Sequence, residues 1–112
     1  MFVLSQTNTY TWPIVVEFPV SGGTHEKQTF DAEFRRLSQS EFEGWLKKIN
    51  DGEATDRDFA KHILVGWKGI TSDNHEVPFS ESSRDKLFDV PLVVGALIRT
   101  YVSSLAGAKA KN

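Results

Sequence analysis

The chain has 112 residues, 39% of them hydrophobic and 25% charged, with a formal net charge of −2 and no cysteine. That length suits one domain with its own core, and the lack of cysteine excludes disulfides, thiolate nucleophiles and cysteine-based zinc sites. A net charge this small gives no argument for nucleic acid or an anionic membrane surface, and we expect neither as a partner.

The chain carries no recognisable targeting or membrane-spanning segment. Residues 1–6 lack the basic start and the apolar stretch of a signal peptide. The longest apolar run, residues 90–105, is interrupted by Arg99, Thr100 and Ser103 and is shorter than the ~20 residues of a membrane span. We therefore expect a soluble protein of the cytoplasm.

The first third of the chain predicts β-structure. Apolar and polar residues alternate in residues 13–18 and again in residues 28–35, which is the period of a half-buried strand. The polar, glycine-containing residues 20–27 between them predict a hairpin loop. Two strands alone are marginally stable, so a packed helix or a third strand, for which Phe2 and Leu4 are candidates, is needed.

Two helix starts follow, each with a capping box. Ser38 and Glu41 begin a helix whose apolar residues fall at 42, 45, 46 and 49, and residues 50–52 end it. Thr55 and Asp58 repeat the pattern before a second helix with Phe59, Ile63 and Trp67 on one side, which Gly66 and Gly69 should end near residue 65.

The C-terminal part predicts two more helices. Ser80 or Ser82 can begin a short helix that continues to residues 87–88. Asp89 is then the expected cap of a last helix, with Pro91 in its first turn and Gly107 at its end. The fold class is therefore α+β, an N-terminal antiparallel hairpin or small sheet followed by three to four helices. We expect one domain over residues 1–107 and a flexible tail over residues 108–112.

The polar residues predict no catalytic centre, no metal site and no cofactor. His25, His62 and His75 are far apart and share no ligand spacing. Asp56 and Asp58 lie in a first helical turn, where the helix dipole accounts for them. An enzyme would need at least two of His25, His62 and these aspartates to meet in one pocket, so we expect a non-catalytic protein.

One stretch of the chain, in its order and spacing, resembles a known family. Gly66-Trp67-Lys68-Gly69 is followed by a polar turn, then Val77-Pro78-Phe79-Ser80, then a helix start and a long apolar helix. Together with the opening Pro13–Pro19 segment and the Phe30/Phe34 strand, this order resembles the tail assembly chaperones of long-tailed bacteriophages. The resemblance spans most of the chain, but each piece of it is short.

The resemblance implies a role in viral tail assembly, in phage or prophage. Proteins of this family bind the long, apolar, helical tape measure protein, keep it soluble, and promote polymerisation of the tail tube around it. It implies the tape measure protein as partner, with the major tail tube protein and weak self-association as further contacts. The place of action is the host cytoplasm, and the protein is not expected in the mature virion.

The family supplies no motif for the binding surface, so its residues are predicted from physical arguments. Trp12 and Trp67 are the aromatic residues least securely assigned to the core. The residues around the glycine-flanked break are predicted to form a partner surface: Trp67, Phe79, Leu87 and Phe88. The alternative is that these four close the core beneath the last helix.

Two other non-enzymatic roles stay open on the sequence. One is a small structural tail component, such as a completion or joining protein of the virion. The other is a host-directed regulatory module that binds one folded protein.

Overall fold

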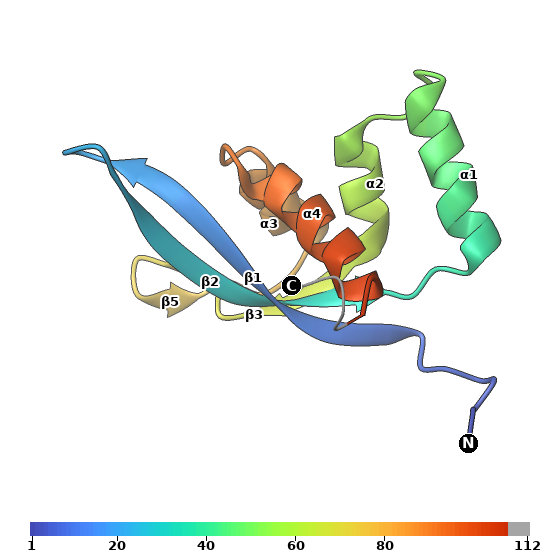
Figure 1. Cartoon of the computed structure of the whole chain (residues 1–112). Helices are drawn as coiled ribbons and strands as arrows, with labels where there is room; N and C mark the ends of the chain where they lie inside the picture. Colours follow the sequence, from blue (N-terminus) through green and yellow to red (C-terminus); the bar gives the residue numbers. More distant parts are fainter. Residues whose placement is uncertain (108–112) are drawn as a thin grey trace.

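The computed structural model describes residues 1–107, in which a three-stranded antiparallel sheet carries four helices on one side (Figure 1). The strands of this sheet, in spatial order, are β1 (Thr9–Val20), β2 (Thr24–Arg35) and β3 (Leu64–Lys68). A separate short pair consists of β4 (Thr71–Ser72) and β5 (His75–Glu76). The helices are α1 (Gln39–Asn50), α2 (Asp56–Ile63), α3 (Glu81–Phe88) and α4 (Val93–Leu105). The predicted α+β class is confirmed, whereas the predicted tail at 108–112 lies outside the described residues.

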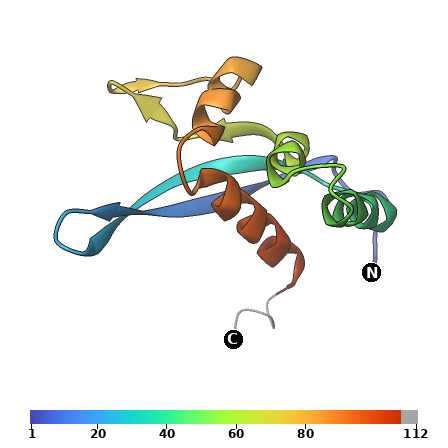
Figure 2. The same cartoon turned by 90° about the horizontal axis from the view of Figure 1, so that it is seen from above.

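The β1–β2 hairpin is longer than predicted. Its pairing runs without a break from Thr9 opposite Arg35 to Val20 opposite Thr24, so the expected loop over 20–27 shrinks to residues 21–23. Gly22 and Gly23 turn the chain there with φ of 95° and 78°, which other residues rarely adopt. The tip projects past the helices (Figure 2), and residues 19–29 are exposed although backbone pairing continues to Val20 and Thr24.

The third strand comes from residues that we had predicted to form the end of a helix, near residue 65, and the break after it. Phe2 and Leu4 form no strand and are 83% and 89% exposed. Instead α2 ends at Ile63 and the chain passes directly into β3, which places Leu64 opposite Phe34. Trp67 therefore projects from a strand. A side chain at Gly66 would bring its Cβ to 2.6 Å from Glu33 Oε1, so the glycine permits close strand pairing.

The helix starts follow the predicted caps in three cases out of four. Ser38 and Thr55 accept hydrogen bonds from the amides of Glu41 and Asp58, and Ser80 does the same at α3. The assignment of Asp89 to the start of the last helix was wrong, because Asp89 ends α3 and Leu92 begins α4. Among residues 1–107 no single helix has the length and apolarity to span a membrane, although α3 and α4 reach these together across a 100° bend.

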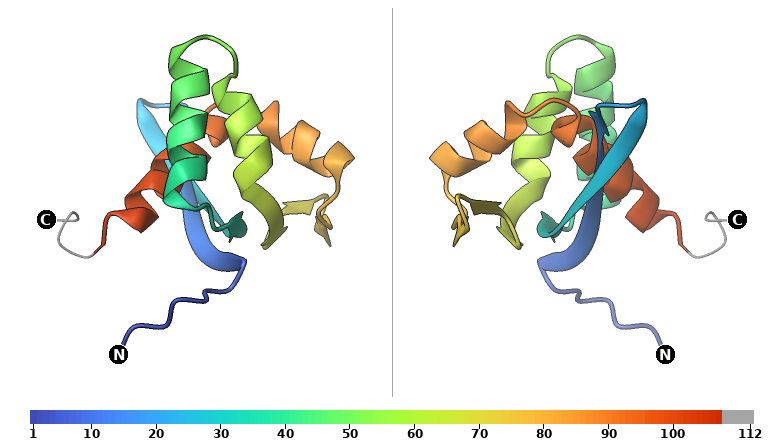
Figure 3. Two further views of the ribbon diagram at one scale, coloured as in Figure 1. Left: turned by 90° about the vertical axis from the view of Figure 1, so that its right-hand side faces the viewer. Right: turned by 90° about the vertical axis from the view of Figure 1, so that its left-hand side faces the viewer.

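The core lies where α4 crosses the sheet (Figure 3) and combines aliphatic residues with an aromatic cluster. The fully buried Tyr101 ring packs edge-on against Phe34 and Phe59, with ring centroids 5.0 and 5.9 Å apart, and stacks on Tyr10 at 6.3 Å. Its hydroxyl donates to the Arg35 carbonyl oxygen at 2.8 Å. Burial raises the pKa of Tyr101 to about 12. These contacts fix α4 over the β1–β2 hairpin and so position the elements of the site.

Candidate functional site

An apolar groove of about 380 Å³ lies between the hairpin, the β3–β5 segment and the α3–α4 connection. Its floor is the helix-facing side of the hairpin, where Val16 and Phe18 of β1 lie beside Phe30 of β2. These residues share one face because alternate side chains of a strand point the same way. No helix covers this part of the hairpin as α4 covers its other end (Figure 1), and the groove results.

One wall of the groove is built on Trp67. The ring packs edge-on against Phe79 with centroids 4.9 Å apart, and its Nε1–H donates to the Val77 carbonyl oxygen at 2.7 Å. The Val77 amide in turn donates to the Ile70 carbonyl oxygen at 2.8 Å. Because the polar atom of the indole is already satisfied inside the chain, the wall offers apolar surface to the groove.

The opposite wall consists of Leu87 from α3 and the connection to α4. Val90, 39% exposed, and Val93, buried, both line the groove. Between them Leu92 has φ of 77° and its side chain is 52% exposed, although this left-handed conformation costs a non-glycine residue roughly 1–2 kcal/mol. An exposed leucine in a strained turn is the kind of outlier from which a functional role can be inferred.

The structure brings together three of the four residues predicted to contact a partner. Trp67 and Leu87 line the groove from opposite sides, and Phe79 supports Trp67 from behind. Phe88 lies in the core at 5% exposure with the Arg57 guanidinium 6.0 Å from its ring centre, so it can only support the groove. The position of Phe88 thus fits the alternative interpretation, in which these residues close the core beneath the last helix. For Trp67, Phe79 and Leu87, binding of a partner stays a prediction.

Several groove residues were missed by sequence reasoning. Ile70 and Val77 bracket the Asp73-Asn74 turn, and Val90 precedes Pro91. The sequence did carry a signal for Ile70 and Val77, because one apolar residue stands on each side of the polar turn. No signal in the sequence marked Val16 and Phe18 as anything other than core.

Two of the residues considered as catalytic candidates lie together, away from the groove. Asp58 and His62 line the same open depression. Two of the candidate residues therefore do meet in one pocket, as an enzyme would require. The Asp58 carboxylate, however, accepts the Thr55 amide at 2.9 Å, and this cap lowers the pKa of Asp58. Burial, and then the nearby Arg35, lower the pKa of His62. Asp58 thus has a structural role as part of the cap, the His62 ring packs against Trp45 with ring centroids 5.1 Å apart, and no hydrogen bond within residues 1–107 joins the Asp58 and His62 side chains.

The other histidines stand apart from this depression. His25 lies on the hairpin near its tip and His75 in β5, and both are exposed. Within the described part of the chain, no three His, Asp or Glu side chains gather closely enough to hold a metal ion.

A second apolar surface runs along α4. Val94 and Ile98 are half-buried, whereas Val102 and Leu105 are 45% and 53% exposed. Their spacing places them along one side of the helix. At its end Leu105 lines a depression of about 370 Å³ together with Tyr10 and Leu37, and this α4 strip is the second place where a partner could bind.

Comparison with known proteins gives one match, which covers the whole chain. No curated protein and no solved structure matches it. A family model described as phage tail assembly chaperone matches residues 1–112. The chain therefore belongs to the phage tail assembly chaperone family, whose members interact with tail proteins in the host while the phage tail is being assembled.

Proposed function

We propose that this chaperone binds apolar helical segments of the tape measure protein in the groove between Trp67 and Leu87 and keeps that protein soluble. The observation that carries the proposal is an apolar groove on a chain of this family, with the polar atom of its largest side chain satisfied internally. A tape measure helix exposes an apolar stripe before the tube encloses it, and bare stripes of that kind associate with one another.

The volume of the groove sets how much of a target one copy can cover. A cavity of about 150 Å³ holds a benzene-sized group, so about 380 Å³ accommodates two or three large apolar side chains. On a helix these are neighbours at positions i, i+3 or i+4, and i+7, which is one to two turns. One copy would therefore mask about 10 Å of helix, and covering a long target takes many copies.

Each contact should be weak. Burying two or three side chains yields about 1.5–3 kcal/mol apiece, and loss of translational and rotational freedom offsets at least about 4 kcal/mol of that sum. Weak contacts allow tail tube subunits to displace the chaperone as they polymerise. Weak self-association of neighbouring copies on one target would add avidity without tighter single contacts.

The mode of action is physical masking with no chemical step. A protein with this role acts in the host cytoplasm during assembly and is absent from the finished virion. Recovery of the chain from purified particles in stoichiometric amount would favour the structural tail component instead.

The test is co-expression with the tape measure protein of the same phage, scoring soluble tape measure protein. We expect the wild-type chain to raise it, and Leu87→Ser and Val90→Ser to abolish most of the gain. Leu46→Ser is the matched control, because Leu46 on α1 is 49% exposed and does not line the groove. Thermal melts must confirm that each variant is folded. A folded Leu87→Ser chain that solubilises as well as wild type contradicts the proposal for this groove.

A further inference from the structure

Lys86 is the single charged residue among the sixteen that line the groove. The remaining lining residues are apolar or neutral, with the amide of Gln28 and the hydroxyls of Thr71 and Ser72 among them. Lys86 itself is exposed, in the last turn of α3 and next to Leu87. A flexible ammonium therefore stands beside an apolar surface that has no negative charge of its own.

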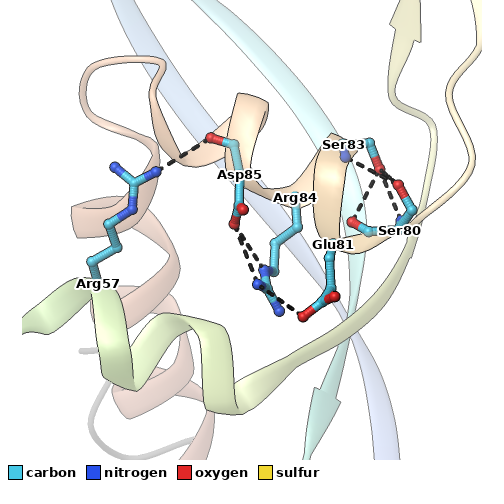
Figure 4. Close-up of polar contacts among 6 residues, drawn as sticks. All are labelled: Arg57, Ser80, Glu81, Ser83, Arg84 and Asp85. Atoms are coloured by element: carbon cyan, nitrogen blue, oxygen red, sulfur yellow. Dashed lines mark hydrogen bonds and ion pairs between the residues drawn. The ribbon is translucent and has the colours of Figure 1, made fainter.

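The two acidic residues of α3, Glu81 and Asp85, already have a cationic partner in Arg84 (Figure 4), and Asp89, the cap residue that ends the helix, forms no ion pair with Lys86. Arg84 Nη2 lies 3.3 Å from Asp85 Oδ1 and 3.9 Å from Glu81 Oε1, with the Arg84 side chain only 14% exposed. Arg57 adds a hydrogen bond to the Asp85 carbonyl oxygen at 3.4 Å. None of the ion pairs within residues 1–107 involves Lys86. Its positive charge is thus available to a bound molecule.

We propose that the groove selects amphipathic helical segments whose apolar stripe is flanked by a carboxylate, and that Lys86 pairs with this carboxylate. The inference rests on the function proposed above and adds to it the charge pattern of the preferred target. An acidic flank next to Lys86 gains a rim ion pair, whereas a basic flank there is repelled. Segments of the target with acidic flanks are then covered in preference to segments with basic flanks.

The size of the selectivity follows from the position of Lys86 at the rim. Exposed ion pairs contribute little because water and salt screen them. We expect an acidic flank to strengthen binding about two- to fivefold over a neutral one. The side chain acts here as a mobile point charge with three donors, so no single geometry of the carboxylate is required.

The experiment uses the full chain and two fluorescein-labelled amphipathic peptides of about 20 residues, long enough to form several helical turns. They share one leucine stripe and differ only in glutamate or lysine at the positions flanking it. Fluorescence anisotropy at low salt should give tighter binding of the glutamate peptide, and the difference should shrink at about 1 M salt, where the Debye length is about 3 Å. Lys86→Glu should reverse the preference. Lys68→Glu makes the same charge change at the exposed last residue of β3, which does not line the groove, and should preserve it.

Three results would overturn the inference: equal affinity for both peptides, a preference that Lys86→Glu leaves intact, or binding of neither peptide. Each is separable from the proposed function, which is judged by soluble tape measure protein. A wild-type chain that solubilises the tape measure protein but binds both peptides equally keeps the function and removes the charge selectivity.

Discussion

Replacing Tyr101 with phenylalanine removes one hydroxyl from the aromatic cluster and leaves the rings in place. The lost hydrogen bond to the Arg35 carbonyl oxygen, 2.8 Å long, is worth about 1 kcal/mol net, and leaving this partly buried carbonyl unpaired raises the cost to as much as about 3 kcal/mol. We take about 2 kcal/mol. With an unfolding entropy of about 2.1 cal/mol/K per residue, this lowers the Tm of the 112-residue chain by about 8 °C.

The same hydroxyl predicts an alkaline effect with a definite sign. Because the pKa of Tyr101 is about 12 in the folded state and 10.0 as a model value, the unfolded chain loses its proton first. Stability from this group is complete below pH 10 and falls as the pH rises toward 12, by about 3 kcal/mol in all. In Tyr101→Phe this part of the alkaline loss should vanish.

Differential scanning calorimetry at neutral pH and chemical denaturation at rising alkaline pH measure both effects. Tyr10→Phe is the matched control at neutral pH, since the half-buried Tyr10 hydroxyl shares a 2.7 Å hydrogen bond with Ser104 Oγ, which also donates to the Tyr101 carbonyl oxygen at 2.6 Å. We expect it to cost less than about 1 kcal/mol, because water can replace the partner. A Tyr101→Phe chain with wild-type Tm and an unchanged alkaline slope would refute the reasoning.

Three other changes test particular local features of the fold. Ser38→Ala should lower the free energy of unfolding in urea by about 1 kcal/mol; since the cap lowers the pKa of Glu41, its contribution is present above the ordinary glutamate pKa and is lost as the pH falls through the folded-state value. Leu92→Gly should be at least as stable as wild type and Leu92→Val about 1 kcal/mol less stable, since only glycine adopts φ of 77° freely; equal stability of these two variants would show that the turn is unstrained. Gly66→Ala should cost about 1 kcal/mol, and a double-mutant cycle with Glu33→Ala should remove most of that cost, because the new Cβ meets the Glu33 carboxylate.

The helix starts were readable from the sequence because a capping box is local. Ser38 with Glu41 and Thr55 with Asp58 lie three residues apart, and the hydrogen bonds that they form are the ones the pattern predicts. Reasoning from local sequence gave the wrong result at Asp89, which is an acceptable N-cap residue. In the structure Asp89 ends α3, and a turn through Leu92 precedes α4.

The third strand could not be predicted from the sequence, because it forms by pairing with a distant segment of the chain. Residues 59–67 fit a helical stripe, but Leu64 gains a place opposite Phe34 in the sheet. Tertiary pairing thus overrides the helical pattern. Only part of the groove could be predicted from the sequence, for a similar reason. Trp67 and Leu87 were recognisable as apolar residues near a break, but the floor supplied by Val16 and Phe18 depends on α4 crossing the hairpin at its other end.

The most direct test of the account is hydrogen exchange of this chain, free and in complex with the tape measure protein. We expect slower exchange in the complex for amides of residues that line the groove, at positions 67, 69–72, 77, 86, 87 and 90, with α1 unchanged. Protection confined to the α4 strip around Val102, or to α1 around Leu46, would contradict the claim that this groove is the surface that masks the target.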